Sequence, residues 1–153
     1  MAIARGAGTE IIRSAHFEDV DSTNQILIVG VQHHIYTVLS VIIQARTLQA
    51  AGNYIRMGVH GYDSKGGTTN QDIYIFQQEM QVGESFVWND KFSFNGCEPA
   101  NFTGPMDNAT KQDAIADQDP SNGSPVSQNL FTNSEHADDT FDITVTYIDQ
   151  NNE

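Results

Sequence analysis

Two adjacent histidines, His33 and His34, stand at the start of the apolar run "HHIYTVLSVIIQA". Imidazoles bind transition metals and transfer protons near neutral pH, so this pair is the first candidate for chemistry. Neighbouring side chains of a strand point to opposite faces, so the two rings cannot hold one ion. His16, His60 and His136 have no zinc-type spacing such as HExxH. We expect a structural role, with one ring packed at the rim of a sheet, the other facing water, and no bound metal.

The segment "DQDPSNG" begins with Asp117 and Asp119, as a calcium-binding EF-hand loop begins with its first and third positions. The sixth position needs Gly and holds Asn122, and the twelfth needs Glu and holds Gln128, so an EF-hand is excluded. A solvated acidic loop is the simpler interpretation. A nonstandard calcium site stays open, with four candidate ligands: Asp117, Asp119, Asp138 and Asp139.

Signals for nucleophilic catalysis or phosphate binding are weak. No GxSxG elbow occurs, and Cys97, the only cysteine, has no activating context. Lys65 in "GYDSKGG" lacks the GxxxxGK[ST] pattern and fits a hairpin turn. The sequons at Asn101 and Asn108 matter only in a secreted eukaryotic protein. We therefore predict no catalytic, cofactor-binding or metal-binding residues and no enzyme activity, although a hydrolase with scattered acidic groups stays an alternative.

An aromatic group around Trp88 is the remaining candidate for binding. Together with Phe86, Phe92 and Phe94 it could form a platform on which sugar rings stack. Their alternation along the chain is more typical of core residues. We predict core packing and keep a carbohydrate-binding module that uses Trp88 as an alternative from a different functional class.

The elements that position these residues are predicted to be strands. In "FDITVTYID", large apolar residues alternate with Asp and Thr from Phe141 to Tyr147, which is typical of a half-buried strand. "YIRMGVHGY" and "DIYIFQQ" show the same period. Gly or Asn-Gly turns separate the runs in "QAAGNY", "GYDSKGGTTNQ", "QVGE" and "FNGCEP". The segment "VLSVIIQARTLQAAG", which includes residues 39–49, ends in Ala-Ala-Gly as a helix could, but the β-branched residues at its start favour a strand.

This spacing predicts an all-β fold, an antiparallel β-sandwich of the jelly-roll or Ig-like type. We expect an N-terminal arm over residues 1–23, a sandwich over 24–148 and a C-terminal tail over 149–153. Residues 101–140 are polar and without periodicity, which predicts a long inserted loop before the last strand. The arm and this loop contain few large apolar residues, so we expect both to become ordered only on assembly.

Charge and composition exclude several classes of protein. Residues 1–100 carry ten acidic and six basic side chains, and residues 101–153 carry ten and one, so −4 and −9 add to the net charge of −13. This charge would repel a phosphate backbone, so we expect no nucleic-acid partner. The beginning of the sequence does not resemble a secretory signal, and no apolar run is long enough for a membrane span.

Several segments together resemble small β-sandwich virion proteins of tailed bacteriophages, particularly phages of marine bacteria and cyanobacteria. The segments are "HHIYTVLSVIIQARTLQ", a Gly-Asn turn, "YIRMGVHGYDSKGGTT", "DIYIFQQEMQVGESFVWNDKFSF" and "FDITVTYID". The resemblance covers about residues 30–100 and 141–148, and the 101–140 segment departs from it.

The resemblance implies a structural protein of the virion, a decoration or cement protein that binds and stabilises the shell of the major capsid protein. It implies a homo-oligomer, such as a trimer, on the capsid surface, assembled in the host cytoplasm, without cofactors. A tail, neck or baseplate component is the alternative within the same class.

Overall fold

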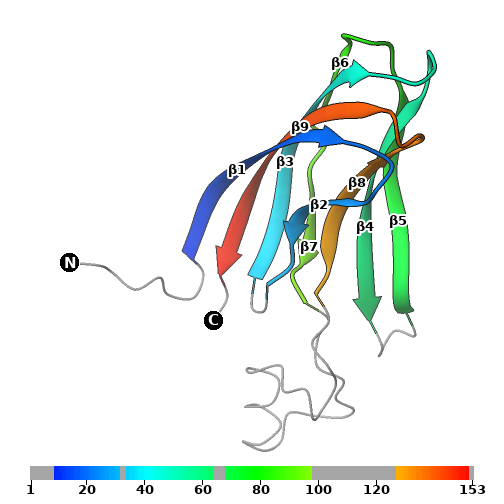
Figure 1. Cartoon of the computed structure of the whole chain (residues 1–153). Coiled ribbons are helices and arrows are strands. Elements are labelled where there is room, and N and C mark those ends of the chain that lie inside the picture. Colours follow the sequence, from blue (N-terminus) through cyan, green and yellow to red (C-terminus); the bar gives the residue numbers. More distant parts are fainter. Residues whose placement is uncertain (1–8, 32–33, 64–67, 98–126, 152–153) are drawn as a thin grey trace, which may run out of the picture.

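The chain forms an all-β fold in the computed structural model, which describes residues 9–31, 34–63, 68–97 and 127–151 (Figure 1). No described residue is helical, as predicted. The strands, in chain order, are β1 (Thr9–Val20), β2 (Gln25–Val29), β3 (His34–Thr47), β4 (Tyr54–Asp63), β5 (Thr68–Glu79), β6 (Ser85–Trp88), β7 (Phe92–Asn95), β8 (Asn129–Ser134) and β9 (Thr140–Asn151).

The strands form two antiparallel sheets. Sheet A has the order β1-β9-β3-β6, and β7 also pairs with β3. Sheet B has the order β2-β8-β4-β5. Because β6 and β7 pair with successive stretches of β3, they act as one strand interrupted after Trp88. The β-sandwich prediction is therefore confirmed.

The pairing pattern identifies a jelly roll among the two architectures predicted. The first strand pairs with the last, β2 pairs with β8, β3 pairs with the interrupted β6–β7 strand, and β4 pairs with β5. These pairs form one long antiparallel ribbon of two chain segments. When the ribbon folds into a jelly roll, successive strand pairs lie in alternate sheets. Figure 1 shows the consequence: β1, β9 and β3 lie side by side, and β2, β8, β4 and β5 form the second layer.

The core lies between the sheets and follows the alternation seen in the sequence. Phe141, Ile143 and Val145 of β9 are fully buried, while the polar residues between them are only partly buried. Residues 39–47 of the 39–49 segment form a strand as predicted, since they lie in β3 and the alternate residues Val41 and Ile43 are fully buried. Sheet B contributes Leu27, Ile28, Ile55, Met57 and Leu130 to the same cluster.

Two of the predicted Gly turns contain a residue with positive φ. Gly52 in "QAAGNY" has φ of 86° and Gly83 in "QVGE" has φ of 87°, and no atom lies near the missing side chain of either. An alanine side chain would therefore fit at either position, but the left-handed backbone conformation favours glycine.

The predicted N-terminal arm is wrong for residues 9–20, which form β1 at the edge of sheet A and pair with β9. The sequence of β1 does not show apolar–polar alternation. Ile11 and Ile12 are adjacent, and Arg13 occupies the inward-facing side, where an apolar residue is expected. The predicted tail is also too long, since β9 continues to Asn151 and Asp149 is buried. Residues 1–8 lie outside the described part of the chain.

The predicted loop over 101–140 is wrong at its C-terminal end. Residues 129–134 form β8, which lies between β2 and β4 in sheet B. Leu130 and Phe131 face opposite sides of this sheet and are both buried, so neither face of the strand is exposed to solvent and its sequence shows no apolar–polar alternation. Residues 101–126 of the predicted loop lie outside the described residues.

Candidate interaction surfaces

The histidines that the structure describes lie in separate places. His16 on β1 bonds Thr144 at 2.9 Å, His60 on β4 pairs with Asp72 on β5, and His136 lies in the β8–β9 turn. His33 lies outside the described residues. Within residues 9–31, 34–63, 68–97 and 127–151, no group of three His, Cys, Asp or Glu side chains is arranged to hold a metal ion.

His34 begins β3, as predicted, and belongs to a partly buried hydrogen-bonded cluster that sequence reasoning missed. Its Nδ1 atom lies 2.5 Å from Asp149 Oδ1, and Arg13 Nε donates to Asp149 Oδ2 at 2.8 Å. The side chains are 18% exposed for His34, 6% for Asp149 and 48% for Arg13. The cluster thus ties the outer strand β1 to β9 and β3.

Burial of Asp149 acts to raise its pKa, but the hydrogen bonds from His34 and Arg13 and the electrostatic attraction to these two side chains more than offset this effect. The net result is a pKa below the ordinary value of 3.8. Asp149 is therefore a carboxylate at neutral pH and serves as an acceptor for two donors. Its role is to hold three strands together, because both of its oxygens are engaged.

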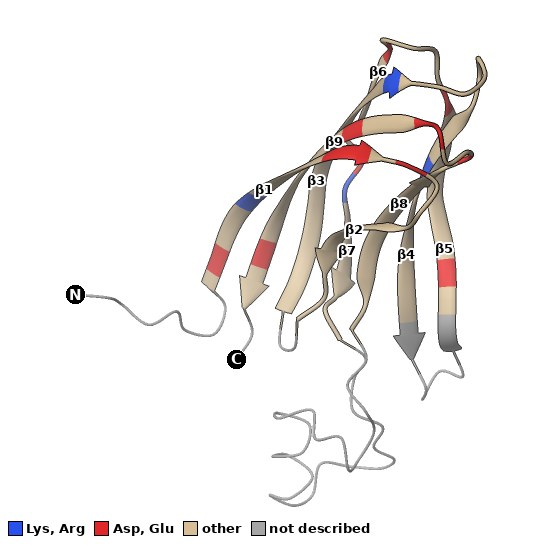
Figure 2. Ribbon diagram, in the orientation of Figure 1, with Lys and Arg blue, Asp and Glu red and all other residues tan. Residues whose placement is uncertain are grey.

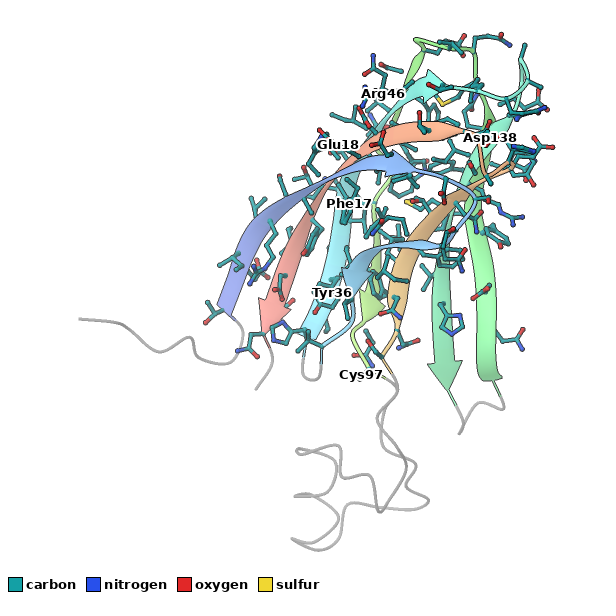
Figure 3. The ribbon with its side chains drawn as sticks, viewed as in Figure 1. Phe17, Glu18, Tyr36, Arg46, Cys97 and Asp138 are labelled. Carbon is teal, nitrogen blue, oxygen red and sulfur yellow. The ribbon has the colours of Figure 1, made fainter. Side chains whose placement is uncertain are left out.

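Tyr36 and Cys97 lie toward one end of the sandwich, and Arg46 lies toward the other (Figure 3). Burial, with the nearby charge of Asp149, raises the pKa of Tyr36 to about 12. Burial also raises the pKa of the Cys97 thiol. Neither group is a reactive nucleophile at neutral pH, since the thiolate and phenolate forms are disfavoured.

The four aspartates considered for calcium have different positions. Asp139 is fully buried and accepts hydrogen bonds from the Gln49 amide at 2.8 Å, Asn53 Nδ2 at 3.0 Å and the His136 amide at 3.0 Å. It therefore fastens the β3–β4 connection to the β8–β9 turn. Asp138 is exposed and lies 3.6 Å from His136 Nδ1. Several other candidates lie outside the described residues: Asp117, Asp119, Lys65, Asn101 and Asn108.

Trp88 packs against the core, which confirms the core interpretation of the aromatic group. Its ring centroid lies 6.4 Å from Phe76 of sheet B and 5.5 Å from Phe92. The four aromatic residues of the predicted group are partly buried against the core cluster: Phe86, Trp88, Phe92 and Phe94. The indole therefore fills space between the sheets rather than forming an open platform.

The two sheets leave long strands at their edges, with large apolar side chains exposed on them. Ile12 on β1 is 71% exposed, and Ile73 on β5 is 69% exposed. Ile42 and Val87 are opposite one another on the outer face of sheet A, at 46% and 54% exposed. An edge strand presents unpaired backbone donors and acceptors to any strand that approaches it. These edges are therefore the surfaces best suited to contact another protein chain.

The outer face of sheet B carries a second, smaller cluster. Phe131 is only 1% exposed although it lies outside the main core, because it packs over Gly58 and against the Tyr74 ring at 5.8 Å. The Arg56 guanidinium lies 4.3 Å from the centroid of Tyr74, and its Nε atom donates to Asn133 Oδ1 at 2.6 Å. This face is therefore amphipathic.

Acidic side chains gather at one end of the sandwich. Figure 2 shows red segments at the C-terminal end of β1, on the neighbouring part of β9 and in the β8–β9 turn. Arg46 lies between two of these carboxylates, 3.6 Å from both Asp19 and Asp142.

In the described part of the chain there is no helix long and apolar enough to cross a membrane.

No protein-family model and no curated protein matches the chain. Among solved structures, a chain of the disulfide-linked pili of Bacillus endospore appendages is similar at 12% identity and a TM-score of 0.43, with 100% of this chain and 97% of that chain covered. Two infectious bursal disease virus structures are also similar. The Gx strain structure has 6% identity and a TM-score of 0.46, and the T13 viral particle has 7% and 0.40.

Both viral matches cover 99% of this chain. This chain spans only 35% and 37% of the two viral chains, about a third of their length. At these identities and TM-scores the likeness assigns neither a family nor a function.

Proposed function

We propose that the protein is a structural component of a tailed-phage virion, a decoration or cement protein that binds the major capsid protein on the outside of the shell and assembles as a homo-oligomer. The observation that carries the proposal is the combination, among the described residues, of long edge strands with exposed large apolar side chains. Single exposed apolar side chains are common on soluble proteins. Here, among the described strands, Ile12 and Ile73 lie on β1 and β5, each of which is the last strand at one side of its sheet.

The virion assignment rests on the resemblance described above, and the fold supports it in one respect. The segments that carry the resemblance form β3 to β7 and β9, so they make up most of one continuous double-layered structure. The net charge of −13 also suits a protein of an outer surface, since it favours solubility and would keep the protein away from packaged DNA.

Co-sedimentation tests this proposal. Purified protein is mixed with isolated phage capsids that lack it and, separately, with isolated tails. We expect saturable binding to capsids and none to tails. Binding to tails alone would move the protein to the tail, neck or baseplate, and binding to neither would refute a virion role. A glycan array serves as the control for the carbohydrate-binding alternative, and we expect no glycan to be bound.

A further inference from the structure

We propose that β1 is a docking strand for a second copy of this chain. Two copies pair β1 with β1, antiparallel, about a two-fold axis at Ile12, and sheet A then continues across both molecules. This inference specifies how the proposed homo-oligomer forms. It rests on the proposed function only in that the protein is a homo-oligomer. It replaces the trimer implied by the resemblance with a two-fold pair.

Among the described strands, β1 offers the longest regular edge. Residues 9–17 pair with β9 in unbroken register, and the first irregularity comes after Phe17. The exposed edge of sheet B is less regular, because the β4–β5 ladder shifts at Gly58 and again after Gly61. β2 at the other edge has only five residues and a shift after Ile26. The outer edge next to β3 is interrupted between β6 and β7.

β1 has few of the features that usually prevent an edge strand from pairing with another chain. Residues 9–17 contain no proline and no bulge. Arg13 is an inward-pointing charge of the kind that protects edge strands, but this charge is paired with Asp149. Ile12 projects from the opposite face and is 71% exposed. A strand that pairs with β1 would meet regular backbone and an apolar side chain.

The charges along β1 select the register. In a two-fold antiparallel pair, facing residues lie at equal distances from the axis. An axis at Arg13 would place two Arg13 side chains opposite one another, and an axis at Ser14 would place Glu10 opposite Glu18. Both arrangements oppose like charges, which is unfavourable. Within the described residues, an axis at Ile11 pairs only residues 9–13, and one at Ala15 extends into the irregularity after Phe17.

An axis at Ile12 avoids these conflicts. It places the Ile12 side chains of the two copies opposite one another on the outer face of sheet A. On the same face, Glu10 of each copy lies opposite Ser14 of the other. On the inner face Ile11 lies opposite Arg13, whose charge is already paired with Asp149. The pairing covers residues 9–15 and buries the most exposed large apolar side chain of the described residues.

Disulfide trapping tests the register. In wild-type protein Cys97 is buried, and it serves as the background in every sample. Facing residues of an antiparallel pair have Cα atoms about 4.5–5.5 Å apart, within disulfide range. Ile12→Cys should therefore form a dimer on mild oxidation, linked through peptides containing position 12. The matched control is Ser14→Cys, whose two copies would lie roughly 14 Å apart along the strands and should not cross-link.

A second pair of variants measures affinity. Ile12→Lys brings two ammonium groups together at the axis and should raise the dimer dissociation constant by about tenfold or more, as measured by analytical ultracentrifugation. Ile73→Lys, at an equally exposed isoleucine on β5, should leave it unchanged.

Equal cross-linking at positions 12 and 14, an oligomer of odd number, or a monomer at every concentration would overturn the inference. Because these measurements use the isolated protein, they are independent of capsid binding.

Discussion

Replacing Asp149 by asparagine removes the charge that joins β1, β9 and β3 while keeping the shape of the side chain. The hydrogen bond from His34 involves two largely buried groups, and a bond to a charged group contributes about 1.5–3 kcal/mol. Arg13 is 48% exposed, so its pair with Asp149 is screened by water and adds no more than about 1 kcal/mol. Asparagine keeps one acceptor, and we expect the free energy of unfolding to fall by about 2–3 kcal/mol at pH 7.

Urea unfolding at several pH values measures this loss. The pKa of Asp149 is lower in the folded protein than its ordinary value of 3.8, so its contribution is complete above that value and is lost as the pH falls through the lowered pKa. The stability difference between wild type and Asp149→Asn should therefore be constant near neutral pH and shrink below about pH 3.8.

The matched control is Asp142→Asn on the same strand. Asp142 lies 3.6 Å from the half-exposed Arg46, so the loss should be below about 1 kcal/mol. Equal losses for the two variants, or a difference from wild type that grows in acid, would refute the role assigned to Asp149.

Three further substitutions test other parts of the structure by the same unfolding measurement. Asp139→Ala leaves three buried or partly buried donors without their acceptor and should cost about 2–4 kcal/mol, whereas a loss below 1 kcal/mol would show that the turn does not depend on it. Phe131→Ala should cost about 3–5 kcal/mol although it lies outside the main core, and a surface-like value near zero would contradict its packing under Tyr74. Trp88→Ala should cost about 2 kcal/mol, less than for a fully buried indole, and loss of glycan binding without loss of stability would instead favour the carbohydrate-binding alternative.

The fold class was predictable from the sequence because several strands have one buried and one solvated face. β9 is the clearest case, since Phe141, Ile143 and Val145 alternate with polar residues. The same physical rule explains the failures. β8 is buried on both faces and β1 is largely exposed on both, so neither shows alternation. Strand pairing across the whole chain, which identifies the jelly roll, has no local signal.

The candidate surfaces were only partly predictable. His34 was expected at the start of a strand, but its partner Asp149 lies 115 residues away and no spacing rule joins them. The packing of Trp88 was predictable because its aromatic neighbours alternate along one strand pair. The edge position of β1 depends on where the other strands of sheet A pair, so the exposure of Ile12 could not be read from its neighbours in sequence.

Cryo-electron microscopy of the tailed-phage virion proposed to contain this chain tests the central claim most directly. We predict density for a two-layered β-sandwich on the outside of the capsid shell, in contact with the major capsid protein, with neighbouring copies related by two-fold axes beside β1. Density confined to the tail or baseplate would contradict the capsid assignment, and absence of the protein from purified virions would contradict the structural role itself.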